Sequence, residues 1–214
     1  MSDLAERRRE ERERRRDEIL SAALIVAATA GFDALTMEQV ARQARLSRAL
    51  IYVYFTDKDD LLFALSERAL VRLIASFRTL IAEAPTGRDR LAAMGRGYVA
   101  FSIEEPVSFE VLARCEARDA ATMPAEGNAE ACLRRADELH AIMVESLRAG
   151  VHDGSITARI DNIDAVATTL WGFMHGIIQI AATKGAVLER RGVTPDLLFA
   201  QALELALNAL GAAR

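Results

Sequence analysis

The side chains best suited to a chemical role lie within residues 45–58, a short segment rich in basic and aromatic residues. Arg48 follows Ser47 at the start of a helical pattern, and an arginine there can donate two hydrogen bonds to the edge of a guanine. Such a contact discriminates between bases by about 1–3 kcal/mol. Ala49 is the neighbouring candidate for a base contact, and Leu50 either touches a thymine methyl group or packs in the core. The segment predicts contact with double-stranded DNA.

Two short helices must position these residues, and the surrounding sequence has the pattern of a helix-turn-helix. Thr36 is a candidate N-cap for the first helix, and Ser47 is a candidate N-cap for the second. Ile51 and Phe55 are assigned to the core. Arg45 occupies the turn, where a left-handed backbone would cost a non-glycine residue about 1–2 kcal/mol. We expect the turn to survive this cost.

From residue 17 to about residue 65 the chain resembles the tetracycline-repressor (TetR) family of bacterial regulators. The resemblance is carried by Tyr52-Val53-Tyr54-Phe55, followed by Lys58 and then by Leu61-Leu62. The family usually has glycine in the turn, where this chain has Arg45, and the arginine adds a positive charge near the DNA backbone.

The resemblance also implies roles for individual residues. Tyr52 and Tyr54 would touch phosphate or a base, Lys58 would touch phosphate, and Thr36 could add a phosphate contact. Phosphate contacts of this kind set the register on DNA, whereas base contacts read the sequence. The complete set of predicted DNA-contacting residues is Thr36, Arg45, Ser47, Arg48, Ala49, Leu50, Tyr52, Tyr54 and Lys58.

Composition predicts an all-α protein. Apolar residues make up 51% of the 214 residues, and four prolines stand against many alanines and leucines. We expect residues 1–60 to form a three-helix helix-turn-helix DNA-binding domain with an N-terminal arm. A long helix then leads into residues 61–214, a helical bundle for ligand binding and dimerisation. Further helices are expected near residues 89–104, 106–119, 128–149, 161–184 and 195–211.

Charge is distributed unevenly. The net charge is −4, but residues 42–58 contain four basic residues and one acidic residue, Asp57. DNA binding requires a positive surface only where the protein meets DNA. Residues 1–18 alternate arginines with acidic residues, which is consistent either with an arm lying on phosphates or in the minor groove or with a solvated helical tail.

The last two predicted helices are more apolar than one chain can bury. Residues 163–182 are long and apolar enough to span a membrane, but Asp164, His175, Gln179 and the nearby Lys184 argue against a span. We expect these helices to pair across a two-fold axis as a four-helix dimer interface, as TetR-like proteins do. The predicted interface residues are Gly172, Gly176, Ile180, Leu198, Ala202 and Leu205.

The resemblance implies a small-molecule site in the C-terminal bundle. Residues 171–176, Trp-Gly-Phe-Met-His-Gly, are similar to a Trp…His-Gly signature in some family members. Adaptable methionines favour an apolar or aromatic effector. An ordinary packed core is the alternative. The candidate lining residues are Met94, Tyr98, Phe101, Phe109, Leu112, Met123, Met143, Leu147, Trp171, Met174 and His175.

No catalytic motif occurs in the sequence, and neither a metal nor another cofactor is expected. Cys115 and Cys132 are interpreted as small core residues, which together with the absence of an apolar leader predicts a reduced, cytoplasmic protein. The function indicated is a dimeric DNA-binding regulator, most simply a repressor released by an effector. The alternatives are a dimeric DNA-binding protein without an effector and a helical enzyme or scaffold.

Overall fold

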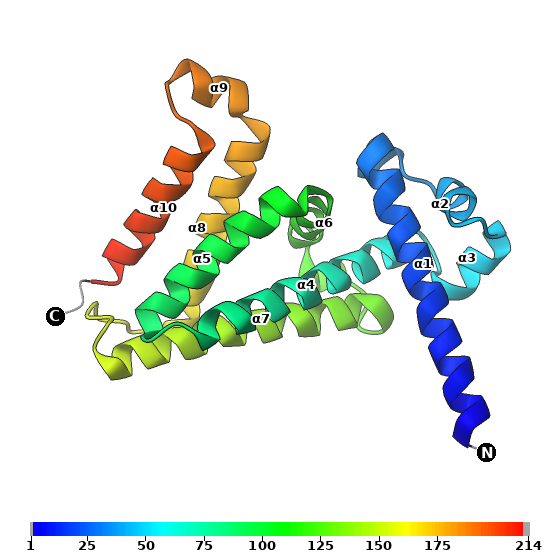
Figure 1. Cartoon of the computed structure of the whole chain (residues 1–214), viewed down its shortest axis with the longest axis horizontal. Helices are drawn as coiled ribbons and strands as arrows, with labels where there is room; N and C mark the ends of the chain where they lie inside the picture. The colour runs from blue at the N-terminus through cyan, green and yellow to red at the C-terminus, as the bar shows by residue number, and fades with distance from the viewer. Residues whose placement is uncertain (1, 212–214) are drawn as a thin grey trace. The chain divides into compact units, whose positions relative to one another are not determined.

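The computed structural model describes residues 2–211, and within this range the chain consists of helices joined by turns and loops, without a strand (Figure 1). This confirms the predicted all-α class. Between α6 and α7, residues Ala120–Thr122 form a 3-10 turn. The helices are α1 (Ser2–Ala34), α2 (Met37–Ala44), α3 (Arg48–Tyr54), α4 (Lys58–Ala82), α5 (Gly87–Glu104), α6 (Pro106–Glu116), α7 (Gly127–Asp153), α8 (Ile163–Thr183), α9 (Gly185–Arg190) and α10 (Pro195–Ala209).

The chain packs as two compact units that are interleaved in sequence. The first unit comprises residues 2–69 and 107–134, and the second comprises residues 70–106 and 135–211. Two of the three cuts fall well inside α4 and α7, so each of these helices contributes to both units, and the third falls at the start of α6. The division at residues 60 and 61 expected from the sequence is a division of function, and it stays a prediction.

In the first unit, α1, α2 and α3 pack around a small apolar core (Figure 1). Ile19 of α1, Val40 of α2 and Ile51 of α3 are all fully buried, and Phe55 joins them immediately after α3. Helices of seven or eight residues are not stable alone in water. Burial against α1 therefore holds α2 and α3 in place.

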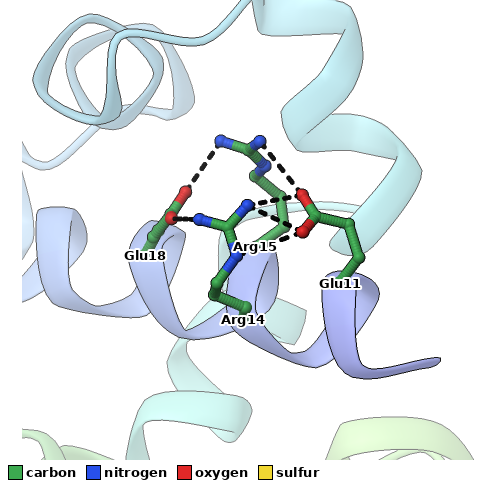
Figure 2. A network of polar contacts seen from close by, with 4 residues as sticks. All are labelled: Glu11, Arg14, Arg15 and Glu18. Atoms are coloured by element: carbon green, nitrogen blue, oxygen red, sulfur yellow. Dashed lines mark hydrogen bonds and ion pairs between the residues drawn. The ribbon is translucent and has the colours of Figure 1, made fainter. Parts of the chain in front are cut away.

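Helix α1 begins at Ser2, so the arginine-rich start is part of the helix, and it carries a break at Gly31. Gly31 has φ 79° and ψ 158°, a conformation that favours glycine, so the regular part of the helix ends there. In the arginine-rich start of α1, Glu11 and Glu18 each form ion pairs with Arg14 and Arg15 (Figure 2). The partners are three or four residues apart, a spacing at which ion pairs stabilise a helix. Hydrogen bonding to Arg14 lowers the pKa of Glu11.

In the second unit, α10 runs beside α8 and also packs on α5, while α9 connects α8 with α10 (Figure 1). The short α9 was not predicted from the sequence. Thr194 caps α10 by accepting a hydrogen bond from the Leu197 N–H at 3.2 Å, and Pro195 follows it at the first helical position. At the start of α5, Gly87 lies directly against Gly150 of α7.

Helix α8 is the one helix within residues 2–211 that is long and apolar enough to cross a membrane. Length and composition alone are weak support for a span, because apolar helices of soluble proteins also meet this test. Only 22% of its apolar window is buried within the chain. Helix α8 therefore leaves apolar surface for a further contact.

Candidate functional site

The helix-turn-helix motif is positioned by side-chain caps at the start of both short helices. Thr36 Oγ1 accepts from the Gln39 N–H at 3.2 Å, and Gln39 Oε1 accepts from the Thr36 N–H at 2.8 Å. This reciprocal capping box fixes where α2 begins. Ser47 Oγ accepts from the Leu50 N–H at 3.2 Å and fixes where α3 begins. Both predicted caps are confirmed.

The turn between the two helices closes α2 through two backbone hydrogen bonds. The Leu46 N–H donates to the Ala41 carbonyl at 2.9 Å, and the Arg45 N–H donates to the Arg42 carbonyl at 3.1 Å. This is the Schellman pattern, which requires a left-handed residue at its fifth position. Arg45 supplies it with φ 57° and ψ 40°. The turn survives without glycine, as expected, and Arg45 bears the strain.

Arg48 and Tyr52 form a pair on the outer surface of α3. Arg48 Nη2 donates to Tyr52 Oη at 3.3 Å, and the guanidinium carbon lies 5.5 Å from the centre of the Tyr52 ring. The hydrogen bond raises the pKa of Arg48, so this side chain remains charged. The two residues are one turn apart, and they present a cation and a phenol together to the solvent.

The structure brings all of the predicted DNA-contacting residues together around α2, α3 and the start of α4. Leu50, Tyr54 and Lys58 are half-buried. Lys58 Nζ donates to the Asp33 carbonyl at 3.1 Å, which ties the start of α4 to the end of α1. The remaining predicted residues are exposed: Thr36, Arg45, Ser47, Arg48, Ala49 and Tyr52.

The N-terminal half of α1 adds cations beside this motif. The Arg12 guanidinium lies 5.3 Å from the centre of the Tyr54 ring, and Arg16 lies 5.8 Å from the Phe55 ring. Arg16 also donates to Glu67 and to Asn128. The arm is therefore attached to the first unit through its arginines. Its two proposed roles, phosphate contact and solvated tail, both stay open.

The second unit contains an apolar cavity of about 50 Å³ that is partly open to solvent. It is lined by one residue of α4, one of α7 and several of α5, α8 and α10. Trp171 is the only tryptophan of the chain. Five of the predicted effector-site residues meet here: Met94, Tyr98, Met143, Trp171 and Met174. The sequence analysis missed the other lining residues, which are Phe77, Leu91, Gly95, Leu170, Leu203, Ala206, Leu207 and Leu210.

Tyr98, Trp171 and His175 form a stacked aromatic cluster at this cavity. The Tyr98 and Trp171 ring centres are 4.5 Å apart at an interplanar angle of 22°, and His175 Nδ1 lies 2.7 Å from Tyr98 Oη. Gln179 Nε2 lies 3.1 Å from His175 Nε2. Burial lowers the pKa of His175, which favours the neutral ring. In the tautomer that accepts from Gln179, Nδ1 donates to Tyr98.

Other predicted effector-site residues lie elsewhere. Phe101 and Leu147 are buried in the second unit but do not line the cavity, and His175 reaches it only through the aromatic cluster. Phe109, Leu112 and Met123 belong to the first unit and do not line this cavity, so their role in effector binding stays a prediction. They were selected for apolar character alone, and α6 and the segment after it pack with the first unit. Among residues 2–211, no group of His, Cys, Asp and Glu side chains is arranged to hold a metal.

Comparison with known proteins agrees with this geometry. Residues 19–65 match the model for bacterial regulatory proteins of the tetR family, and residues 91–206 match the model for a tetracyclin repressor-like C-terminal domain. The second match alone spans more than half of the chain.

The chain belongs to the TetR family. Members of this family are DNA-binding transcription regulators, a class without enzymatic activity. They are soluble, so the single apolar helix α8 is not a convincing membrane span.

Individual TetR-family relatives support the fold. A 45-residue segment is 49% identical to the HTH-type transcriptional regulator HbdR of Aromatoleum sp. (strain CIB), but it covers only 21% of this chain and 20% of HbdR. A tetR-family regulator from Rhodococcus RHA1 superimposes with a TM-score of 0.69 at 19% identity, over 94% of this chain and 98% of that one. FadR of Bacillus subtilis in complex with stearoyl-CoA gives 0.70 at 19% identity, over 90% and 97%.

The predicted dimer residues of this TetR-family chain lie on α8 and α10 with different exposures. Gly172, Ile180 and Leu205 are exposed, whereas Gly176 and Leu198 are half-buried. Ala202 is only 3% exposed within the single chain, so it has little surface left for a second copy. Its role in the interface stays a prediction, because helical spacing does not reveal which apolar face turns inward.

The first prediction concerns Arg45, the left-handed residue in the turn of this TetR-family motif, and its effect on the free energy of unfolding. Replacing Arg45 with glycine removes the Cβ that disfavours the left-handed backbone, while glycine gains some freedom in the unfolded chain. We expect Arg45→Gly to raise the free energy of unfolding by about 1 kcal/mol. Urea denaturation followed by circular dichroism measures this change.

Arg42→Gly is the matched control, because it makes the same substitution on the same helix in a right-handed position. There glycine should lower the free energy of unfolding by about 1 kcal/mol. Opposite signs for the two variants support the strain assignment. Destabilisation by both variants would show that Arg45 contributes more through its side chain than its backbone strain removes.

Proposed function

We propose that this chain is a transcriptional repressor that binds operator DNA as a homodimer and is released by a small apolar or aromatic effector. The observation that carries the proposal is the exposed Arg48–Tyr52 pair at the start of α3, on a motif capped at both of its helices. The N-terminal residues of a recognition helix are the ones that reach base edges in the major groove. As a bacterial regulator acting on DNA, the protein would work in the cytoplasm.

The second prediction concerns the effect of Arg48 on operator binding. Its guanidinium is charged, exposed and held beside Tyr52, so it can turn from the phenol to a guanine edge without leaving a buried group unpaired. We expect Arg48→Ala to weaken specific operator binding by about tenfold to a hundredfold. A gel shift at fixed salt, using the DNA upstream of the protein's own coding region, measures this effect.

Arg134→Ala serves as the control. Arg134 is an exposed arginine of α7 outside the motif, paired with Glu130 at 2.8 Å. Its replacement should leave the gel shift unchanged. If Arg48→Ala and Arg134→Ala bind as tightly as the wild type, α3 does not read DNA in the proposed manner. If no specific complex forms even at low salt, the helical enzyme or scaffold becomes the better interpretation.

Effector binding requires the cavity of the second unit to grow. Ligand sites for small molecules usually measure about 300–1,000 Å³. The present cavity of about 50 Å³ lies well below this range. An effector would therefore have to separate α5, α8 and α10, whose side chains form most of the cavity wall. The crystal structure of FadR with stearoyl-CoA shows that another protein of this fold accommodates a ligand.

The effector signal would travel along α4. Phe77 of α4 lines the cavity, and the same helix begins at Lys58, directly after the helix-turn-helix motif. We propose a shift in population, in which the effector prefers a state of the bundle that holds the two DNA-reading motifs at an unsuitable separation. Half-sites read in successive major grooves are about 34–36 Å apart, or a multiple of this distance.

The small cavity also favours a second candidate, a dimeric DNA-binding protein without an effector. Trp171 separates the two, because the only tryptophan of the chain lines the cavity and its emission reports on occupancy. Under the main proposal, a compound that shifts Trp171 emission also releases operator DNA at matching concentrations. If compounds occupy the cavity and DNA affinity stays constant, the second candidate is favoured.

A further inference from the structure

Arg88 has incompletely satisfied hydrogen-bonding groups at the start of α5. The side chain is half-buried, and Nη2 donates to the Leu207 carbonyl of α10 at 3.1 Å. Its Nε is buried and has no acceptor among the described residues. A buried N–H without an acceptor is unfavourable and points to a missing partner.

Arg88 does not line the cavity, but it is hydrogen-bonded to a residue that does. Leu91 and Gly95 follow it three and seven residues later, so all three residues share one face of α5, and both later residues line the cavity. Leu207, whose carbonyl accepts from Arg88, lines the cavity too, as does Leu210. The cavity wall itself is almost entirely apolar. The cationic group of Arg88 lies beyond it, on the carbonyl of Leu207, so a molecule in the cavity would have to extend past Leu207 to reach it.

We propose that the effector is an amphipathic carboxylate, with its apolar body in the cavity and its carboxylate group paired with Arg88. This inference rests on the proposed effector response and specifies its chemical class. A guanidinium group matches a carboxylate with two parallel hydrogen bonds, stronger than the bond it makes to a neutral carbonyl. The ligand carboxylate would replace the Leu207 carbonyl as the acceptor of the Arg88 hydrogen bond. This bond would then no longer hold the end of α10 to α5, and the cavity could enlarge.

The test compares each acid with its uncharged amide. 4-Phenylbutanoate and decanoate are titrated against 4-phenylbutanamide and decanamide, with Trp171 emission as the readout of affinity. We expect each acid to bind the wild type at least tenfold more tightly than its amide, since hydrogen bonds to charged groups are the stronger ones. In Arg88→Gln this preference should disappear, while the amides bind as they do to the wild type.

Arg90→Gln is the matched control. Arg90 is another half-buried arginine of the first turns of α5 whose Nε lacks an acceptor, but it lies on a different face of the helix from Leu91. The preference for acids should persist in this variant. Arg88→Lys keeps the charge but cannot form the two-point contact. This variant should keep a smaller preference for the acids over the amides. It also tests the proposal if Arg88→Gln weakens the packing of α10.

Three results would overturn the carboxylate assignment. The first is amides that bind as tightly as their acids, and the second is no binding of either acid at millimolar concentration. The third is an equal affinity of Arg88→Gln and the wild type for the acids. None of these results affects the proposed repressor function, which is decided by the operator gel shifts with Arg48→Ala and by release of DNA with other compounds.

Discussion

Replacing Gly87 with alanine should destabilise the second unit more than any other glycine substitution considered. A Cβ at position 87 would lie 2.0 Å from the Gly150 nitrogen and 2.5 Å from the Ser146 carbonyl oxygen. Both are backbone atoms of α7, which cannot rotate away as a side chain does. We expect Gly87→Ala to lower the free energy of unfolding by about 3–5 kcal/mol, at the upper end for overpacked sites. Urea denaturation followed by Trp171 emission measures it.

The comparison with Gly185→Ala isolates the steric cause. A Cβ at Gly185 meets no atom within 4 Å, and this residue also lies at the start of a helix. Its substitution should leave the denaturation midpoint within experimental scatter. A Gly87→Ala protein as stable as the wild type would mean that α5 and α7 do not cross at Gly87 and Gly150. The cavity bounded by these helices would then need a different description.

The DNA-binding motif could be predicted closely from sequence because its determinants are local. Thr36, Ser47 and Thr194 each cap a helix through a residue three positions ahead, so residue type and spacing are sufficient. The buried positions of the motif, Ile51 and Phe55, follow from helical periodicity in the same way. The family resemblance gave roles that periodicity cannot provide, and those roles remain proposals.

The cavity could be predicted only in part because its wall depends on long-range packing. Periodicity shows that α10 is apolar on more than one side, but it does not show which side faces α8 and α5. Leu203 and Leu207 turned out to face the cavity, whereas Leu205 faces outward. The sequence also provided no indication that Arg88 lacks a hydrogen-bond acceptor. Its missing acceptor becomes visible only when the neighbours of its Nε are known.

The exposed faces of α8 and α10 supply the prediction with the largest expected effect on function. Ile180 is 43% exposed within the single chain, and Gly172 and Gly176 precede it on the same face of α8, with nothing within 4 Å of an added Cβ. In the proposed dimer this face would be buried. An aspartate at position 180 should therefore be tolerated by the single chain but should place an unpaired charge in the interface.

We expect Ile180→Asp to be monomeric at micromolar concentration in analytical ultracentrifugation. Because two linked DNA-reading motifs bind far more tightly than one, its operator affinity should fall by about 10²–10⁴-fold. Ile103→Asp is the control, since Ile103 of α5 is 63% exposed and lies outside the proposed interface, so this variant should remain dimeric and bind DNA normally. A dimeric Ile180→Asp protein with wild-type operator affinity would show that α8 does not form the interface. Monomers that still bind the operator tightly would instead separate dimerisation from DNA recognition, because a single α2–α3 motif would then account for the affinity.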